Sequence, residues 1–308
     1  MARTRLIIDT DPGVDDAVAI LLALASPEVE VVGITTVAGN VPLEKTTLNT
    51  RRLLSLVGRH DVPVCAGAAE AMAGPNGYDG VVHGHDGLGD LAWDEPEVPL
   101  DSRSAVDFLY EQLCAAPTTL VAIGPLTNLG HLLRQHPDVV DKVERVVVMG
   151  GASFEGNVTP AAEFNVWADP EAAALVAEAA WHCAWMPLDA THQVFLTDDD
   201  LVTFRGWNTE VGHRLAGMLD PYADFHDQWY GSRDTIMHDA LAVYEVLRGD
   251  AITKVPAAVT VECGGTYSRG ATWFDRRLVN ADSSHVVATA VANDEFSHLL
   301  VQRLSTFS

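Results

Sequence analysis

The sequence predicts an α/β fold: a single domain built on an open, mostly parallel, doubly wound sheet of Rossmann-like type. β-Branched runs alternate with Ala- and Leu-rich segments of helical period, which favours right-handed strand–helix–strand units. Glycine and aspartate gather in the loops after the strands, where ligands of such sheets bind. With 308 residues, 48% of them hydrophobic, and no linker or repeat, residues 1–308 are expected to form one domain.

The first part of the chain supplies most of the expected sheet. Strand-like segments are found at residues 5–9, 29–36, 62–65, 119–123, 145–149 and 181–187. The helices between them are expected to begin near Asp15, Leu43, Ser102, Leu126 and Asp169. Because parallel strands end at one edge of the sheet, the loops after these strands should meet there.

The last part of the chain has a different pattern. Residues 198–247 are expected to be largely helical. Three further strands, which we expect to include antiparallel ones, are predicted at residues 257–263, 270–275 and 284–289, and a C-terminal helix is predicted from Asp294.

Composition narrows the function classes. The formal net charge of −24 repels phosphate backbones and argues against nucleic-acid binding. No window approaches the roughly 18–20 uninterrupted apolar residues of a membrane-spanning helix, and the N-terminus lacks the features of a secretory signal. We therefore expect a soluble, cytoplasmic protein. The four cysteines are widely spaced without a C-x-x-C pair, which argues against a zinc finger or a disulfide framework.

The first predicted loop carries a dense acidic cluster. Within "LIIDTDPGVDDAVAI", residues 6–20, four aspartates occupy eight positions: Asp9, Asp11, Asp15 and Asp16. Helix capping explains one or two of them, but not four. Carboxylates this close need a cation, and hard oxygen ligands without neighbouring His or Cys favour Ca²⁺ or Mg²⁺. The spacing is not that of an EF-hand, because position twelve counted from Asp9 is Ile20.

Two later segments place polar groups at the start of apolar elements, and the first of them fits a sugar. In "AEFNVWADP", Glu163 and Asn165 are one residue apart, so in an extended loop they face the same way; with Asn157 they suit a polyhydroxylated ligand. Ordinary turn chemistry is the alternative interpretation. In "IMHDALAV", His238 and Asp239 open an apolar helix, where capping is again the alternative.

The glycine-rich loop "VHGHDGLGD", residues 82–90, is the last candidate segment. It is interpreted either as a lid that closes on substrate or as an exposed loop. The chain lacks the Walker and G-x-G-x-x-G spacings, so a phosphate-binding loop is not indicated.

Taken together, these segments resemble the nucleoside hydrolases, the inosine–uridine preferring N-ribohydrolases. The N-terminal "DTDPGVDD" is similar to the signature of that family. The matching segments that follow, in the family's order, are "TTVAGN", "HGHDGLGD", "GPLTNL", "VVMGGASFEGNVTPAAEFNVWADPEAA", "DATHQV" and "HDALAV". The resemblance covers residues 5 to about 245 and implies the nucleoside hydrolase fold.

The resemblance also implies a site. One Ca²⁺ would be held by the side chains of Asp11, Asp16 and Asp239 and by the backbone carbonyl of Ile123. The ribose of a ribonucleoside would be contacted by Asp15, Asn40, Asn157, Glu163 and Asn165. A homodimer or homotetramer is implied in the same way.

The family mechanism implies roles for individual residues. A Ca²⁺-bound water, with Asp11 as general base, would attack the anomeric carbon and release the free base in nucleoside salvage. His238 would meet or protonate the leaving base, which favours inosine- and uridine-type substrates, and His83 would line the base pocket. Residues 221–233 correspond to a mobile helix that closes on the base, and the choice among Tyr222, His226, Gln228 and Tyr230 is left open. Asp9 has no firm role.

Two other functions share part of this pattern. A haloacid-dehalogenase-type phosphatase also begins with a strand and D-x-D, and it would use Asp9 as its nucleophile; the later loops do not fit it. A Ca²⁺-dependent ribose or nucleoside binding protein would keep the metal ligands without needing a general base.

Overall fold

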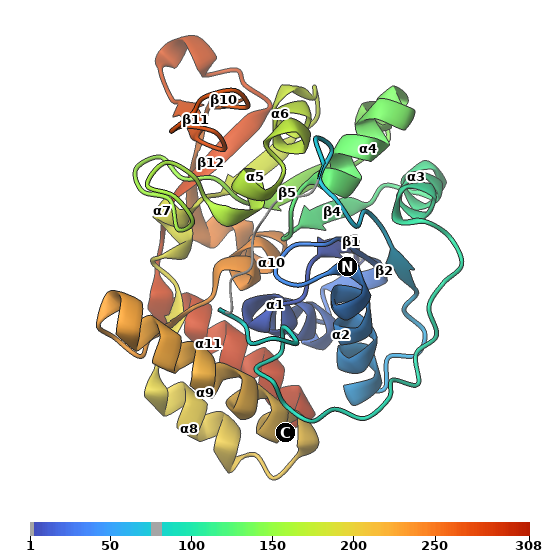
Figure 1. The fold of residues 1–308 in the computed structure, drawn as a ribbon, viewed down its shortest axis with the longest axis vertical. Helices are drawn as coiled ribbons and strands as arrows, with labels where there is room; N and C mark the ends of the chain where they lie inside the picture. The colour runs from blue at the N-terminus through green and yellow to red at the C-terminus, as the bar shows by residue number, and fades with distance from the viewer. Residues whose placement is uncertain (1–2, 75–81) are drawn as a thin grey trace.

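A computed structural model describes residues 3–74 and 82–308. Within them, an eight-stranded sheet has the order β3-β2-β1-β4-β5-β6-β12-β9 (Figure 1). Its strands are β1 (Thr4–Thr10), β2 (Val29–Thr36), β3 (Val64–Ala66), β4 (Thr119–Ala122), β5 (Arg145–Met149), β6 (Cys183–Met186), β9 (Ile252–Pro256) and β12 (His285–Val291). All neighbouring strands pair in parallel except β12 and β9. The predicted α/β fold class is confirmed.

The strand order reverses at β1. This strand pairs in parallel with β2 on one side and with β4 on the other, while β3 and β5 continue outward. Ligands of doubly wound sheets bind at such a switch point, beyond the carboxyl ends of the strands. The aspartate-rich loop directly follows β1, so the topology places it at this position.

Helices cover both faces of the sheet. One face packs with α1 (Val14–Ala25), α10 (His238–Arg248) and α11 (Asn293–Leu304), and the other packs with α3 (Ala105–Ala115), α4 (Thr127–Gln135) and α6 (Pro170–Glu178) (Figure 1). Side chains alternate along β1: Leu6 and Ile8 enter the first core, and Ile7 enters the second. The remaining helices are α2 (Leu43–Leu56), α5 (Phe164–Ala168), α7 (Leu188–Thr191), α8 (Asp198–Gly206) and α9 (Glu210–Tyr230).

The C-terminal part departs from expectation in two places. Strand β9 was not predicted; its "ITKVP" has weak alternation and a terminal proline, which suits the sheet edge it occupies. The predicted strand at 284–289 is β12, which is parallel to β6 and antiparallel to β9 in the main sheet. Antiparallel pairing, as expected, is also found between β10 (Ala258–Val261) and β11 (Thr272–Asp275). The mostly helical region 198–247 is interrupted by β8 (Thr235–Ile236), which pairs with β7 (Phe195–Leu196).

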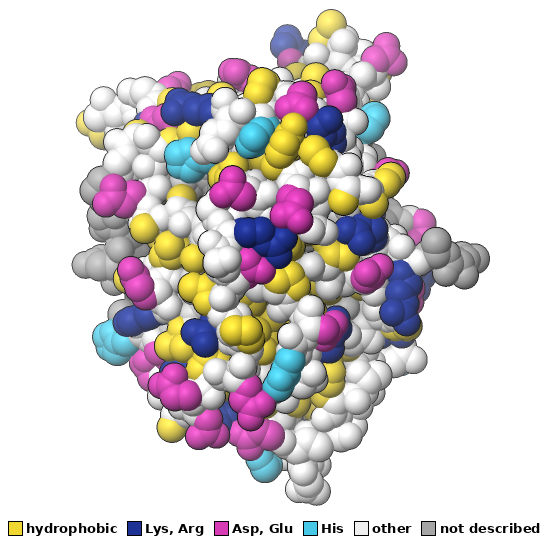
Figure 2. Space-filling model, turned by 90° about the vertical axis from the view of Figure 1, so that its right-hand side faces the viewer, with side chains coloured by type: hydrophobic (Ala, Val, Ile, Leu, Met, Phe, Trp, Pro, Cys, Tyr) yellow, Lys and Arg dark blue, Asp and Glu magenta, His cyan; other side chains and the backbone are white. Residues whose placement is uncertain are grey.

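The acidic excess is distributed differently on the surface and inside. On the face drawn in Figure 2, Asp and Glu side chains lie scattered among Lys and Arg rather than in one patch. Inside, several aspartates are fully buried near the carboxyl edge of the sheet. In the described part of the chain, no helix combines the length and apolarity needed to cross a membrane.

Candidate active site

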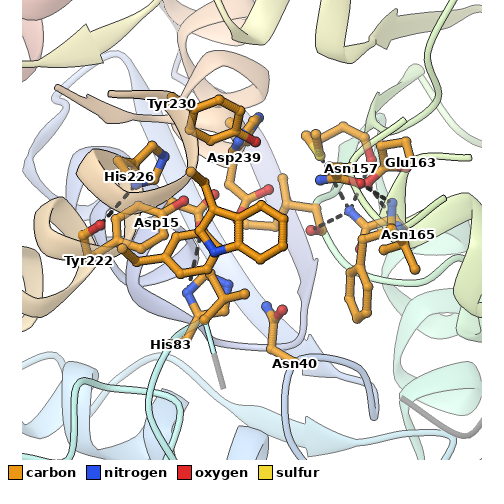
Figure 3. Close-up of a pocket in the computed structure, with 18 of the residues that line it drawn as sticks. Asp15, Asn40, His83, Asn157, Glu163, Asn165, Tyr222, His226, Tyr230 and Asp239 are labelled. Atoms are coloured by element: carbon orange, nitrogen blue, oxygen red, sulfur yellow. Dashed lines mark hydrogen bonds and ion pairs between the residues drawn. The ribbon is translucent and has the colours of Figure 1, made fainter. Parts of the chain in front are cut away.

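A cavity of about 560 Å³ opens at the carboxyl edge of the sheet (Figure 3). Nine of the predicted site residues line it: Asp15, Asn40, His83, Ile123, Asn157, Glu163, Asn165, His238 and Asp239. They come from the loops after β1 to β5 and from the start of α10, so the expected meeting of the loops is confirmed. Asp11 and Asp16 are fully buried and are not part of the cavity lining.

Three buried carboxylates converge at one end of the cavity. Asp15 and Asp16 stand in the first turn of α1, and Asp239 stands in the first turn of α10. Each offers a carboxylate oxygen, and these atoms lie within 4.8 Å of one another. The resemblance assigned Asp15 to the ribose, yet it belongs to this acidic group, whereas Asp11 does not.

Asp16 is held rigidly by its neighbours. Its Oδ1 accepts a hydrogen bond from the Thr10 hydroxyl at 2.5 Å, and its Oδ2 accepts from the Gly13 amide at 2.9 Å. The side-chain amide of Asn40 also donates to Oδ2, at 3.2 Å. Capping therefore accounts for Asp16 in part, because the Gly13 amide is one of the unpaired groups at the start of α1.

Asp11 has an oxygen without a partner. Its Oδ2 accepts from the backbone amide of Asn40 at 2.7 Å, but its buried Oδ1 has no hydrogen-bond partner among the described residues. Two glycines make room for this carboxylate: a Cβ on Gly39 would lie 2.0 Å from Oδ2, and one on Gly124 would lie 2.5 Å from Oδ1. An unpaired, buried carboxylate oxygen beside other carboxylates fits a site for a cation.

The electrostatics of the site support the same conclusion. Burial, together with the neighbouring carboxylates, raises the pKa of Asp15 to about 8 and raises the pKa values of Asp11 and Asp239 well above the ordinary value. Within residues 3–74 and 82–308, no Lys or Arg forms an ion pair with Asp11, Asp15, Asp16 or Asp239. The residues present therefore fit a hard, oxygen-bound metal ion.

One wall of the cavity is built by the loop after β5. Glu163 caps α5 and accepts hydrogen bonds from the amides of Gly151, Asn165 and Val166 at 2.8–3.1 Å. Burial nevertheless raises its pKa to about 7. Glu163 therefore both caps a helix and lines the cavity. The two interpretations of the sequence, a turn residue and a ligand-binding residue, do not exclude each other.

The two asparagines of this loop are fixed in different ways. Asn165 donates through Nδ2 to the carbonyl oxygens of Ile123 at 3.0 Å and Met149 at 3.2 Å. Asn157 accepts through Oδ1 from the Phe164 amide at 2.9 Å. The Ile123 carbonyl predicted as a metal ligand therefore already accepts one hydrogen bond, and its second lone pair is the one available to an ion.

The opposite wall of the cavity is aromatic. Tyr222, His226, Gln228 and Tyr230, between which the sequence could not decide, all line it, together with Phe225 and Trp229 (Figure 3). They come from the C-terminal half of α9, where steps of three and four residues place side chains on one face. Phe225 and Trp229 were not singled out from the sequence, although this spacing marks them.

His238 lines the cavity and stands next to Asp239 at the start of α10. Its Nδ1 is 2.8 Å from the Thr191 hydroxyl, and burial lowers its pKa well below the ordinary value. Thr191 is fully buried on α7. Sequence reasoning missed it as a partner of His238, because it lies in a different predicted segment.

Asp9 has a different position from the other three aspartates of its segment. Its Oδ1 accepts from the Thr35 hydroxyl at 2.5 Å and from Asn128 Nδ2 at 2.7 Å, which ties β1 to β2 and α4. It is fully buried and does not line the cavity, and burial raises its pKa to about 7. This position does not suit the nucleophile of a haloacid-dehalogenase-type phosphatase.

Comparison with known proteins decides the family. Residues 6–298 match the family described as "Inosine-uridine preferring nucleoside hydrolase". The chain belongs to this family. It is therefore a hydrolase that acts on N-glycosidic bonds of ribonucleosides, and the resemblance found in the sequence is confirmed.

The nucleoside hydrolase has relatives that match along nearly their whole length. It is 38% identical to the pyrimidine-specific ribonucleoside hydrolase RihA of Salmonella gallinarum, over 98% of this chain and 99% of the relative. Among solved structures it is similar to a plant nucleoside hydrolase, with a TM-score of 0.93, 32% identity and coverage of 98% and 99%. A purine-preferring ribonucleoside hydrolase from Gardnerella vaginalis gives a TM-score of 0.94 at 31% identity, covering 99% of each chain.

Proposed function

We propose that this nucleoside hydrolase cleaves inosine- and uridine-type ribonucleosides to ribose and free base with one Ca²⁺ in its site. The observation that carries the proposal is the buried group of aspartates, unpaired with Lys or Arg in the described chain, at one end of a cavity whose other walls are amide-rich and aromatic. The relatives named above include pyrimidine-specific and purine-preferring enzymes, and the higher identity to the former favours uridine and cytidine.

The metal would be held by Asp11, Asp16 and Asp239 with the carbonyl of Ile123. The unpartnered Oδ1 of Asp11 and the raised pKa values of the group support this assignment. Bound Ca²⁺ would supply the positive charge that lets these carboxylates stay ionised together, lowers the pKa of water and attracts the ribose hydroxyls.

Asp11 is proposed as the general base. Its Oδ1 accepts no hydrogen bond among the described residues, so this oxygen is available to take a proton from the attacking water. The backbone amide of Asn40 and the close approach of Gly39 and Gly124 hold the carboxylate in place. Fixing a base in advance removes the cost of orienting it during the reaction.

Asp15, Asn40, Asn157, Glu163 and Asn165 are proposed as ribose contacts. Cleavage of the N-glycosidic bond places positive charge on the sugar, and fixed carboxylate and amide oxygens stabilise that charge. The hydrogen bonds of Glu163 and Asn165 to backbone groups support such fixed positions.

His238 is proposed to serve the leaving base. Burial keeps it neutral, so it would stabilise the departing base by donating a hydrogen bond rather than as a preformed imidazolium. The Thr191 hydroxyl can donate to Nδ1, which would leave the proton on Nε2.

A substrate panel tests the proposal. Turnover of p-nitrophenyl riboside, uridine, cytidine, inosine and adenosine is measured for the wild type and for Asp11→Ala. We expect turnover of uridine and inosine that Asp11→Ala abolishes. Riboside binding without turnover would indicate a binding protein instead, and hydrolysis of p-nitrophenyl phosphate would indicate a phosphatase. The single domain over 1–308, the homodimer or homotetramer and the cytoplasmic location stay predictions of the sequence.

A further inference from the structure

Three ring side chains form one continuous wall of the cavity. His83 stacks on Tyr222, with ring centroids 5.3 Å apart, and Tyr222 meets His226 edge to face at 4.4 Å. All three line the cavity, and Figure 3 shows them on the side opposite the loop of Glu163 and Asn165. The two histidines are therefore held at fixed positions on the same wall.

The proton position on His226 follows from its hydrogen bond. Its Nδ1 lies 2.9 Å from the backbone carbonyl oxygen of Tyr222, one turn earlier in α9. A carbonyl oxygen can only accept, so Nδ1 must carry the proton. In the neutral ring, Nε2 then has a lone pair and is a hydrogen-bond acceptor. Burial lowers the pKa of His226, which favours this neutral form.

The proton position on His83 is opposite. The backbone amide of Val14, at the start of α1, donates to its Nδ1 at 3.1 Å. Nδ1 therefore has the lone pair, and in the neutral ring the proton is on Nε2, which is a donor. Burial lowers the pKa of His83 to about 3, so the ring is neutral at physiological pH.

We propose that His226 is a specificity-determining residue, which accepts a hydrogen bond from the base through Nε2 while His83 donates one through Nε2. The wall then favours bases that present a ring N–H beside a carbonyl oxygen. The imide edge of uracil, in which N–H lies next to a carbonyl, has this pattern. The inference rests on the proposed function, because it names the base-reading groups of the same site.

The chain offers a matched set of variants. His226→Phe keeps a planar ring but removes the acceptor, and His226→Gln restores an acceptor oxygen on a flexible side chain. His213→Gln is the control: His213 lies on the same helix, is exposed and does not line the cavity. The probes are uridine, 3-methyluridine, in which the imide N–H is replaced, and p-nitrophenyl riboside, whose leaving group has no such edge.

For the wild type we expect kcat/KM for uridine to exceed that for 3-methyluridine by roughly tenfold or more, since an unsatisfied buried acceptor is costly. In His226→Phe this ratio should fall towards one, and kcat/KM should decrease less for p-nitrophenyl riboside than for uridine. His226→Gln should recover part of the ratio, and His213→Gln should keep the wild-type ratio.

Failure of the inference and failure of the proposed function are distinguishable. If the wild type hydrolyses uridine but His226→Phe keeps the wild-type ratio of uridine to 3-methyluridine, His226 does not read the base. If His226→Phe loses activity on uridine and p-nitrophenyl riboside equally, with normal thermal unfolding, its role is not base recognition. If the wild type turns over no riboside at all, the proposed function is overturned, and this inference with it.

Discussion

Helix α10 carries two buried carboxylates in contrasting surroundings. Glu245, near its C-terminal end, is 2% exposed and accepts hydrogen bonds from Lys254 Nζ at 2.6 Å and Arg145 Nη1 at 3.2 Å. Asp239, in its first turn, is 4% exposed and lies against Asp15 and Asp16. The described residues provide no Lys or Arg partner for Asp239.

The difference separates a charge that the fold neutralises from a charge that it leaves without a cationic partner among the described residues. Two cations of the chain neutralise Glu245, so it completes the fold by itself. Asp239 and its neighbours repel one another and are stable together only with protons or an added cation. Burial alone therefore does not identify the site; the close approach of several carboxylates that have no Lys or Arg partner among the described residues does.

The largest expected effect is on activity, at Asp11, which lies close enough to the acidic group of Asp15, Asp16 and Asp239 for its pKa to be raised by Asp16 and Asp15. Asp11→Asn should lower kcat for uridine roughly 10³-fold or more, because a carboxamide cannot take the proton from water. Steady-state kinetics measure the loss, and unfolding by urea checks that the protein still folds. A kcat within tenfold of the wild type would remove Asp11 as the base. Glu245→Gln, the matched change at the paired carboxylate, should retain wild-type kcat.

Calcium should stabilise the protein through the same group. At a free concentration one hundred times its Kd, Ca²⁺ should raise the free energy of unfolding by about 2.7 kcal/mol, since it binds only the folded state. Thermal unfolding in EGTA and in Ca²⁺ measures the difference. Asp16→Asn should reduce this gain, while Glu245→Gln should keep it. Equal stability with and without Ca²⁺ in the wild type, at saturating concentration, would contradict a calcium site.

Glu163 should make stability depend on pH. Its folded pKa of about 7 lies above the ordinary value of 4.5, so its contribution is fully present below about pH 4.5 and is lost as the pH rises through 7. Relative to Glu163→Gln, which cannot titrate here, the wild type should lose about 2–3 kcal/mol between pH 5 and pH 8. Urea unfolding at both pH values, in EGTA, measures this. A pH-independent difference between the two proteins would show that Glu163 is not held with a raised pKa.

The smallest expected effect is at the paired carboxylate. Glu245→Gln should lower the free energy of unfolding by about 1–2 kcal/mol, because Lys254 and Arg145 lose their charge partner but are partly exposed and can be hydrated. Urea unfolding in Ca²⁺ measures the loss. A large decrease in kcat with an unchanged free energy of unfolding would mean that Glu245 belongs to the site.

Much of the fold and site followed from local pattern. The β-branched runs predicted the strands of the parallel sheet, and the order of the loops predicted which side chains would meet at its carboxyl edge. Strand β9 was not predicted, because an edge strand needs little alternation of apolar and polar residues. The neighbours of β12 in the sheet could not be predicted, because strand pairing depends on contacts between residues far apart in the sequence. The base-side residues of α9 could not be chosen until the helix was placed against the cavity.

By itself, the sequence determined the family, the parallel strands β1 to β6 and the acidic loop after β1, because these depend on residue types in order along the chain. Only the tertiary structure decided where each of the four aspartates of that loop lies. It placed Asp9 against Thr35 and Asn128, Asp11 against the backbone amide of Asn40, and Asp15 and Asp16 against Asp239. It also set the proton positions on His83 and His226, because these depend on the Val14 amide and the Tyr222 carbonyl that each ring meets in space.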